Sequence, residues 1–487
     1  MFELLQPEDL AAADDGAVVD AVEGWARAEA ADAARRLAAI AELVERRCGA
    51  EDDPSDVRGM WSCDRWDATA AEVGAALNLS ARRASSQMYL AQSLRERLPG
   101  VNALFLQGRI AAQLVSTISW RTHLVVDGDA MAAIDAGIAA AASEWGLLSQ
   151  AKVEQTIDAL IEQHDPQAKE WFRQAERGMD VQFGKPDDDT GTRSMWGRLY
   201  STHAQLIERK LTSIARAVCA EDPRTVGQRR AEAMAAVFAG ADRIACQCGA
   251  PDCPNPTSPA LASSVVVHVV ADHATVVRAG AQDDTAAQKS DEETEAVRPA
   301  AVMTSGGVIP TPLLAQLIRN GATVMPLRTP CEQAEQRYRP STALQRFIRC
   351  RDMTCRFPGC DAPAEHCDID HAIPYPHGST HPSNLRCLCR KHHLLRTFWT
   401  GAGGWADRQS PDGTIIWTAP TGRTYVTHPG SHFFLPAWNV TTAELPPSCP
   451  DTPAPENRSL MMPRRHRTRA AERAQRIKSR RAQLDSS

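Results

Sequence analysis

Cysteine and histidine residues gather between positions 355 and 393 with a spacing that suits metal binding. The segment CRFPGC supplies Cys355 and Cys360, and the segment LCRKHHLLRTFW supplies Cys389 and His392. Structural zinc takes four nitrogen or sulfur ligands in a closed tetrahedron, usually as two close pairs. Cys355 and Cys360 form one pair across a Pro-Gly turn, and Cys389 and His392 form the other on one face of a helix. The sequence therefore predicts a structural zinc site.

The gap between the two pairs is too long for a zinc finger of the DNA-reading type. We expect a hairpin in this gap, carrying Asp370, His371 and Asn384. His393 follows His392 directly, so it is rotated by about 100° around the helix and faces away from the zinc. A carboxylate and an imidazole with coordination positions left open suit a catalytic divalent cation. A further imidazole beside them suits a general base.

These residues resemble the HNH nuclease motif on a ββα-metal, treble-clef-like fold. The segments CRFPGC, CDIDHAIPYPHGSTHPSNLRCLCRKHHLLRTFW and GWADRQSPDGTIIWTAPTGRTY more closely resemble actinobacterial HNH endonuclease-like proteins of the 13E12 repeat family. Those proteins pair a long Ala-rich helical N-terminal domain, of unknown function, with a C-terminal HNH domain. The resemblance also suggests an association with mobile elements.

The resemblance implies a metal-dependent endonuclease that hydrolyses DNA phosphodiester bonds. His371 would be the general base, and Asn384 would fix the hairpin and orient the ring of His371, although in some HNH enzymes the matching Asn ligates metal. Asp370 and His393 would hold a catalytic Mg²⁺ or Mn²⁺. The structural zinc would be bound by Cys355, Cys360, Cys389 and His392. Many HNH proteins carry Cys where this chain has His392, and imidazole is also a good zinc ligand.

Four basic residues flank the proposed site and are candidates for contact with DNA phosphates: Arg386, Arg390, Lys391 and Arg396. A positive surface suits phosphate contact, although basic side chains also simply solvate a helix. The alternative to a nuclease is a non-catalytic DNA-binding or regulatory protein that uses the same zinc-braced fold. A further alternative places the function in the helical half, which would bind protein partners.

The remaining cysteines raise the question of a second metal site. Cys246, Cys248 and Cys253 lie in the segment CQCGAPDC, and His268 or His273 would supply a fourth ligand. No second close pair completes the pattern, so the sequence leaves this site open. We expect three further cysteines to be ordinary buried thiols, although Cys387 offers an alternative to Cys389 as a zinc ligand; they are Cys350, Cys367 and Cys387.

Residues 1–240 are rich in Ala, Glu, Arg and Leu with apolar residues at helical spacing, so we expect an Ala-rich helical domain there. Residues 69–94 have the outline of a helix-turn-helix, with a turn at Asn78 and Leu79. Its second helix would bring Arg82 and Arg83 to a DNA groove. A helical hairpin that only packs would produce the same pattern.

The rest of the chain divides by composition. We expect a mixed connector over 241–340 with an acidic disordered linker at 281–298, and then the HNH domain over 341–400. Residues 401–440 predict a β-strand extension. Residues 441–487 predict a Pro-rich linker and a basic disordered tail, whose positive charge is typical of a nucleic-acid arm.

The chain of 487 residues carries a formal net charge of -6, and this charge is unevenly spread. No apolar run is long enough to cross a bilayer, so we expect no membrane span. The acidic start MFELLQPEDL lacks the features of a secretory signal, so we expect a cytoplasmic protein. Fourteen cysteines in a reducing compartment favour metal binding over disulfides.

Overall fold

The structure is a computed structural model, and it describes most of the chain. The described ranges are 5–49, 57–168, 180–187, 192–199, 201–250, 252–253, 269–281, 301–303, 308–319, 322–444 and 462–484. Nearly all of the acidic segment at 281–298 and the Pro-rich segment that begins at 445 lie outside these residues.

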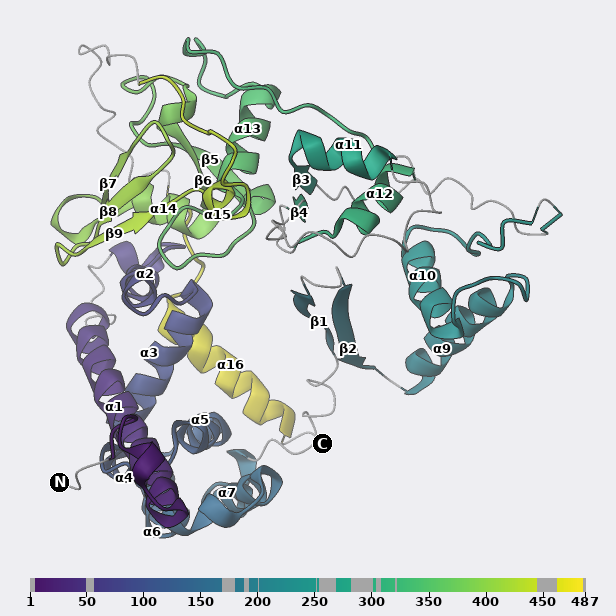
Figure 1. Cartoon of the computed structure of the whole chain (residues 1–487). Helices are drawn as coiled ribbons and strands as arrows, with labels where there is room; N and C mark the ends of the chain where they lie inside the picture. Colours follow the sequence, from purple (N-terminus) through teal and green to yellow (C-terminus); the bar gives the residue numbers. More distant parts are fainter. Residues whose placement is uncertain are drawn as a thin grey trace. The chain divides into compact units, whose positions relative to one another are not determined.

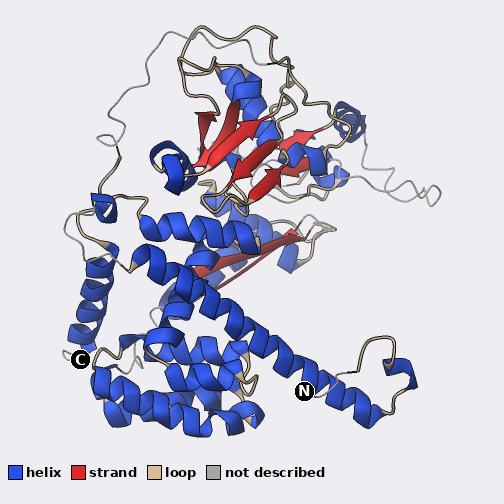
Figure 2. Cartoon of the chain, turned by 90° about the vertical axis from the view of Figure 1, so that its left-hand side faces the viewer, coloured by secondary structure: helices blue, strands red, loops and turns tan. Residues whose placement is uncertain are grey.

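The chain forms two compact units. The first joins residues 1–171 to residues 326–487, and the second comprises residues 172–325. The described residues are mainly helical, with small antiparallel sheets, as Figure 2 shows in blue and red. The expectation of a mainly helical N-terminal part is confirmed.

The N-terminal part of the first unit is a helical bundle (Figure 1). Its α-helices are α1 (Asp15–Cys48), α2 (Arg65–Leu77), α3 (Ala81–Glu96), α4 (Pro99–Leu106), α5 (Ala112–Arg121), α6 (Gly128–Ala141) and α7 (Gln150–His164). Short 3₁₀ turns lie at Leu10–Ala12, Val57–Met60, Thr122–Leu124, Ala142–Leu147 and Pro166–Ala168.

Sequence chemistry explains where these helices begin and pack. The side chain of Asp14 accepts a hydrogen bond from the backbone N–H of Ala17 and so caps α1, and Asp64 caps α2 in the same way. Alanines on α1 let the helices approach closely, while larger side chains such as Met88 and Phe105 fill the bundle core.

The C-terminal part of the first unit surrounds the Cys/His segment. Its helices are α13 (Thr342–Asp352), α14 (Arg390–Phe398), α15 (Gly430–Phe434) and α16 (Arg469–Leu484), with 3₁₀ turns at Ala364–His366, Pro382–Asn384 and Gly401–Gly403. Strands β5 (Cys367–His371) and β6 (Leu385–Cys389) form an antiparallel pair, and α14 follows β6 directly. Strands β7 (Ala406–Gln409), β8 (Ile415–Thr418) and β9 (Thr424–Thr427) form a three-stranded antiparallel sheet in the predicted extension.

Helix α2 belongs to both hydrophobic cores of the first unit. Its residues Trp66 and Val73 pack into the helical bundle, whereas Ala71 and Ala75 pack against the C-terminal part. The indole N–H of Trp399 donates to the carbonyl of Cys63, just before α2, over a distance of 2.9 Å. The Cys/His domain is therefore packed onto the helical bundle.

The predicted helix-turn-helix outline corresponds to α2 and α3. Asn78 ends α2 in the left-handed conformation, with φ of 52°, and the next helix begins at Ala81. Arg82 and Arg83 are exposed on α3. The turn itself lies against the other half of the unit, because a Cβ on Gly359 would come within 2.8 Å of the Leu79 carbonyl oxygen.

The C-terminal tail differs from the prediction of a disordered arm. Residues 469–484 form α16, and Ile477 on this helix packs against the core of the helical bundle. Arg469 binds the carboxylates of Asp64 and Asp67, and Arg481 binds Asp165. Acidic partners on the bundle neutralise these cations, so the net positive charge of the tail does not prevent it from folding onto the bundle.

The second unit contains the hairpin of β1 (Asp180–Asp187) and β2 (Thr192–Arg198), and the strand pair of β3 (Val269–Ala271) and β4 (Ala301–Met303). Its helices are α9 (Ser201–Arg216), α10 (Val226–Phe238), α11 (His273–Ala281) and α12 (Thr311–Arg319). The helical domain predicted over 1–240 therefore divides near residue 171, because α9 and α10 build a small core of their own around Ile214 and Ala233.

Candidate metal and catalytic site

The four predicted zinc ligands lie together in the structure. One ligand atom from each of Cys355, Cys360, Cys389 and His392 lies within 4.8 Å of all the others. Nδ1 of His392 is 3.3 Å from Sγ of Cys389 and 3.5 Å from Sγ of Cys355. Zinc bonds of about 2.0–2.3 Å place tetrahedral ligands about 3.5–3.8 Å apart. The side chains therefore fit a single zinc ion.

Local backbone geometry builds this cluster. Cys360 follows Gly359, whose φ of +72° favours glycine, and its N–H donates to the Phe357 carbonyl. Cys389 ends β6 and is the N-cap residue of α14, so His392 lies on the first turn of that helix. The ring of His392 stacks on Phe357 with the ring centroids 4.1 Å apart.

Hydrogen bonds within the cluster favour thiolate at one position. The hydrogen bond with Cys355 has the largest effect and the hydrogen bond with Cys360 the next largest, and both hold the pKa of the Cys389 thiol well below its usual range. The backbone N–H of Cys389 in turn donates to Sγ of Cys355 over 3.3 Å. The alternative ligand Cys387 lies elsewhere, fully buried, with its Sγ directed to the carbonyl of Ile348.

Asp370 and His393 meet on the other side of α14. Oδ1 of Asp370 lies 3.5 Å from Nε2 of His393. The other ring nitrogen of His393, Nδ1, is 2.8 Å from a carboxylate oxygen of Asp368. A carboxylate that accepts from one imidazole nitrogen fixes the tautomer and leaves the other nitrogen as a metal ligand. The pair fits a divalent cation held by Asp370 Oδ1 and His393 Nε2.

Sequence reasoning missed Asp368. The available signal was its position two residues before Asp370, since alternate residues of a strand share one face. Both carboxylates lie on β5, which brings them to the same imidazole.

His371 ends β5 beside this pair. Its Nε2 lies 2.9 Å from the hydroxyl oxygen of Thr380, and that hydroxyl donates its proton to the carbonyl of Arg337 at 2.5 Å. Since a hydroxyl has one proton, Thr380 accepts from Nε2–H of His371. The Nδ1 atom therefore keeps its lone pair, and burial lowers the pKa of His371, which favours the neutral ring.

Asn384 closes the loop between β5 and β6. Its Oδ1 accepts from the backbone N–H of Ile373 at 2.7 Å, and its Nδ2 donates to the carbonyls of Ile373 and Ser379. Because Ser379 precedes Thr380, these bonds also position the partner of His371. These side-chain hydrogen bonds of Asn384 all lie within this loop.

The four basic residues expected to contact DNA have different environments. Arg386 is 0% exposed, and its guanidinium binds Asp370 and Asp407. This burial contradicts the expectation that Arg386 contacts DNA. The strand is covered on both faces, so Arg386 instead holds the second oxygen of Asp370.

The other three basic residues also have acidic partners. Arg396 is largely buried and binds Asp407, and it donates to the carbonyl of Ala372. Lys391 binds Asp67 on α2 at 2.8 Å. Arg390 is exposed and binds Asp368 at 3.3 Å, and of the four it is the most open to a phosphate.

Together these features define a mainly helical protein with small antiparallel sheets and groups of Cys and His side chains that could hold a metal. The chain belongs to the DUF222 family, described as a domain of unknown function, whose family model matches residues 25–352. The matched segment ends before Cys355, so it covers the helical bundle and the second unit but not the Cys/His segment.

The chain is similar over nearly its whole length to proteins of Mycobacterium tuberculosis. It is 53% identical to uncharacterized protein Rv3776 of strain H37Rv, over 99% of this chain and 93% of that protein. It is 51% identical to uncharacterized protein Rv2100 of the same strain, over 100% of this chain and 91% of that protein. No solved structure matches the chain.

Among the described residues, no helix combines the length and the apolar character that crossing a membrane would require.

Proposed function

We propose that the chain is an HNH-type endonuclease that hydrolyses DNA phosphodiester bonds with a divalent metal ion. The observation that carries this proposal is the arrangement around β5 and α14. Asp370 Oδ1 and His393 Nε2 lie 3.5 Å apart, and the adjacent His371 has its Nε2–H committed to Thr380. This hydrolysis needs two ligands that hold a divalent cation and a neutral imidazole whose lone pair can accept a proton.

In this proposal Nδ1 of His371 takes a proton from the attacking water. The cation, Mg²⁺ or Mn²⁺, supplies Lewis-acid stabilisation of the charge that develops on the phosphate. Arg386 binds Oδ2 of Asp370, and Asp368 binds Nδ1 of His393. Oδ1 of Asp370 and Nε2 of His393 are therefore the atoms that would hold the metal. Asn384 and Thr380 hold the ring of His371 in place.

Zinc at Cys355, Cys360, Cys389 and His392 has a structural role in this proposal. Four protein ligands leave no open position for water, which is typical of a structural site. The zinc joins the loop before β5 to the beginning of α14 and so fixes the helix that carries His393.

The partner in this proposal is DNA. Exposed cations on the first unit are available for phosphate contacts, including Arg82 and Arg83 on α3 and Arg390 on α14. Each would position the duplex without reading its sequence.

The test is cleavage of supercoiled plasmid by the full-length protein in Mg²⁺ and in Mn²⁺, with EDTA as a control. We expect metal-dependent cleavage that His371→Ala abolishes, with zinc content and DNA affinity unchanged. His366→Ala, which changes an exposed histidine of the same domain, is the matched control and should cleave like the wild type.

Two results would contradict the proposal. Undiminished cleavage by His371→Ala would remove this residue as the base. DNA binding without cleavage in either metal would favour the non-catalytic DNA-binding protein instead.

A further inference from the structure

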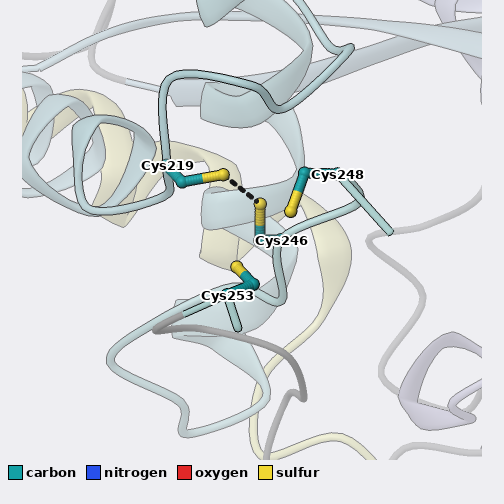
Figure 3. A group of neighbouring side chains, drawn as sticks. All are labelled: Cys219, Cys246, Cys248 and Cys253. Atoms are coloured by element: carbon teal, nitrogen blue, oxygen red, sulfur yellow. Dashed lines mark hydrogen bonds between the residues drawn. The ribbon is translucent and has the colours of Figure 1, made fainter. Parts of the chain in front are cut away.

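Four cysteines of the second unit gather at one point (Figure 3). Their Sγ atoms all lie within 4.8 Å of one another, and Sγ of Cys219 is 3.1 Å from Sγ of Cys246. Cys219 lies in the loop between α9 and α10, and Cys246, Cys248 and Cys253 follow α10. The fourth member is therefore a cysteine far upstream of CQCGAPDC, whereas the sequence had suggested His268 or His273. Of those two, His268 lies outside the described residues.

A buried polar network connects the loop between α9 and α10 to the segment that follows α10. The side chain of Asp222 is 0% exposed, and its Oδ2 accepts from Arg224 at 2.6 Å and from the N–H of Gln247 at 3.0 Å. Arg224 also donates to the carbonyl of Ala245 at 2.6 Å. Ala245 and Gln247 flank Cys246, so this network sets the distance between Cys219 and Cys246.

The backbone around the thiols suits thiolate ligands. The N–H of Ala250 hydrogen-bonds to Sγ of Cys248, and the N–H of Glu221 hydrogen-bonds to Sγ of Cys219. In each case the donor lies two residues after the cysteine. Gly249 has a φ of +70°, which turns the chain so that the N–H of Ala250 points back to the sulfur. Hydrogen bonds of this kind stabilise metal-bound sulfur.

We propose that Cys219, Cys246, Cys248 and Cys253 form a second structural zinc site, separate from the one on α14. Zn–S bonds of about 2.3 Å place the sulfurs of a tetrahedral site about 3.8 Å apart, which matches a cluster of this size. Four thiolates leave no open position, so the site is structural and not catalytic. Soft thiolates also select zinc over Mg²⁺ or Mn²⁺.

The second unit has a physical need for such a site. Among the described residues, the buried members of the hydrophobic cluster around α9 and α10 are Ile214, Val218, Ala233, Ala236 and Ile244. A core this small contributes little stability, and small domains often add a metal for this reason. The zinc would connect the segment that follows α10 to the loop between α9 and α10.

The first experiment measures zinc in the full-length protein, purified under reducing conditions. We expect about two zinc ions per chain in the wild type and about one in Cys219→Ser. Cys360→Ser should also retain about one, because it removes only the site on α14, and the double variant should retain none. The matched control is Cys331→Ser, an exposed cysteine outside both clusters, which should retain both ions.

Three results would overturn the proposal. The wild type could hold a single zinc that Cys360→Ser removes. Cys219→Ser could keep the full zinc content. Alkylation without reductant, followed by mass measurement, could show a disulfide between Cys219 and Cys246 in place of free or metal-bound thiols. Such a disulfide would bring the two sulfurs to about 2.05 Å from each other.

A second variant addresses the concern that Cys219→Ser loses zinc merely because it misfolds. Cys248→His replaces one ligand by another, so the metal should be retained. In the Cys360→Ser background, Co²⁺ should give the charge-transfer absorption of a four-thiolate site, and Cys248→His should lower it by about a quarter. No such absorption in the Cys360→Ser protein would overturn the site.

Discussion

The two histidines of the proposed active site each have one ring nitrogen committed to a neighbouring side chain. Thr380 occupies Nε2 of His371, and Asp368 occupies Nδ1 of His393. The remaining nitrogens are Nδ1 of His371 and Nε2 of His393, and the second of these lies 3.5 Å from Oδ1 of Asp370. In the proposed mechanism the first is the base and the second is a metal ligand, so neighbouring residues would assign the roles of two similar side chains.

Thr380→Val tests this assignment. Valine keeps the shape of threonine but removes the acceptor that fixes the tautomer of His371, so we expect plasmid cleavage to fall by about 10- to 100-fold. Zinc content and DNA affinity should stay unchanged. The measurement is the rate of plasmid cleavage at saturating metal.

Two control variants accompany Thr380→Val. Ser379→Ala removes a neighbouring buried hydroxyl that has no hydrogen-bond partner among the described residues, so it should cleave like the wild type. Thr380→Ser keeps the hydroxyl and should retain most of the activity. Equal rates for Thr380→Val and the wild type would show that Thr380 does not set the tautomer.

Sequence reasoning predicted the residues that belong to one motif. It missed residues that the motif does not specify. Asp370, His371, Asn384 and His393 were predicted because their spacing is specific to one motif. Thr380 was missed because threonine is a common residue whose hydrogen bonds depend on how the loop closes. Cys219 was missed for a related reason: a single cysteine 27 residues before Cys246 carries no spacing signal.

At the scale of elements, Arg386 connects two sheets. It lies on β6, binds Asp370 on β5 and Asp407 on β7, and its guanidinium lies 4.8 Å from the ring centre of Trp417 on β8. A buried cation between two buried carboxylates is stabilised only while the partners stay in place. The pair of strands β5 and β6 and the three-stranded sheet therefore depend on each other.

Arg386→Met should destabilise the first unit by about 3 kcal/mol, because it leaves Asp370 buried without its arginine and leaves Asp407 with Arg396 alone. Urea unfolding followed by tryptophan fluorescence measures this effect, since Trp417 lies beside the site. The comparison variant is Arg390→Met on the exposed surface of α14. There we expect a change within about 0.5 kcal/mol, because exposed ion pairs contribute little.

The salt dependence of DNA binding is the measurement that could contradict the structural role of Arg386. If Arg386→Met kept wild-type stability and flattened the salt dependence of DNA affinity, Arg386 would be a phosphate contact after all. The sequence could not separate these roles, because a basic residue on a strand beside the candidate site is compatible with either. Only the pairing of Arg386 with Asp370 and its full burial distinguish them.

Across the whole molecule, the last helix, α16, is bound to distant parts of the first unit by ion pairs. Asp67 on α2 binds Arg469 on α16 and Lys391 on α14, each at 2.8 Å. The far end of α16 is held by Arg481, which binds Asp165 after α7. Composition alone predicted a free basic arm, because the acidic partners are hundreds of residues away in the sequence.

The double variant Arg469→Met with Arg481→Met tests whether α16 is structural. It removes one cation from each of three largely buried carboxylates, while Arg465 still lies beside Asp64 and Asp67. We expect the first unit to lose about 3 kcal/mol of stability. Thermal unfolding and limited proteolysis of the full-length chain measure the effect, with cleavage expected between α15 and α16 once the helix detaches.

The matched control changes the cations that α16 and its approach expose to solvent. These are Arg464, Arg467, Arg476 and Lys478. Changing all four to Gln should leave the unfolding midpoint near that of the wild type, because these side chains are exposed at the surface. If the tail also contacts DNA, this variant should flatten the salt dependence of binding while the double variant acts through stability. A double variant as stable as the wild type, with α16 still protected from protease, would show that the ion pairs with Asp64, Asp67 and Asp165 do not hold the helix.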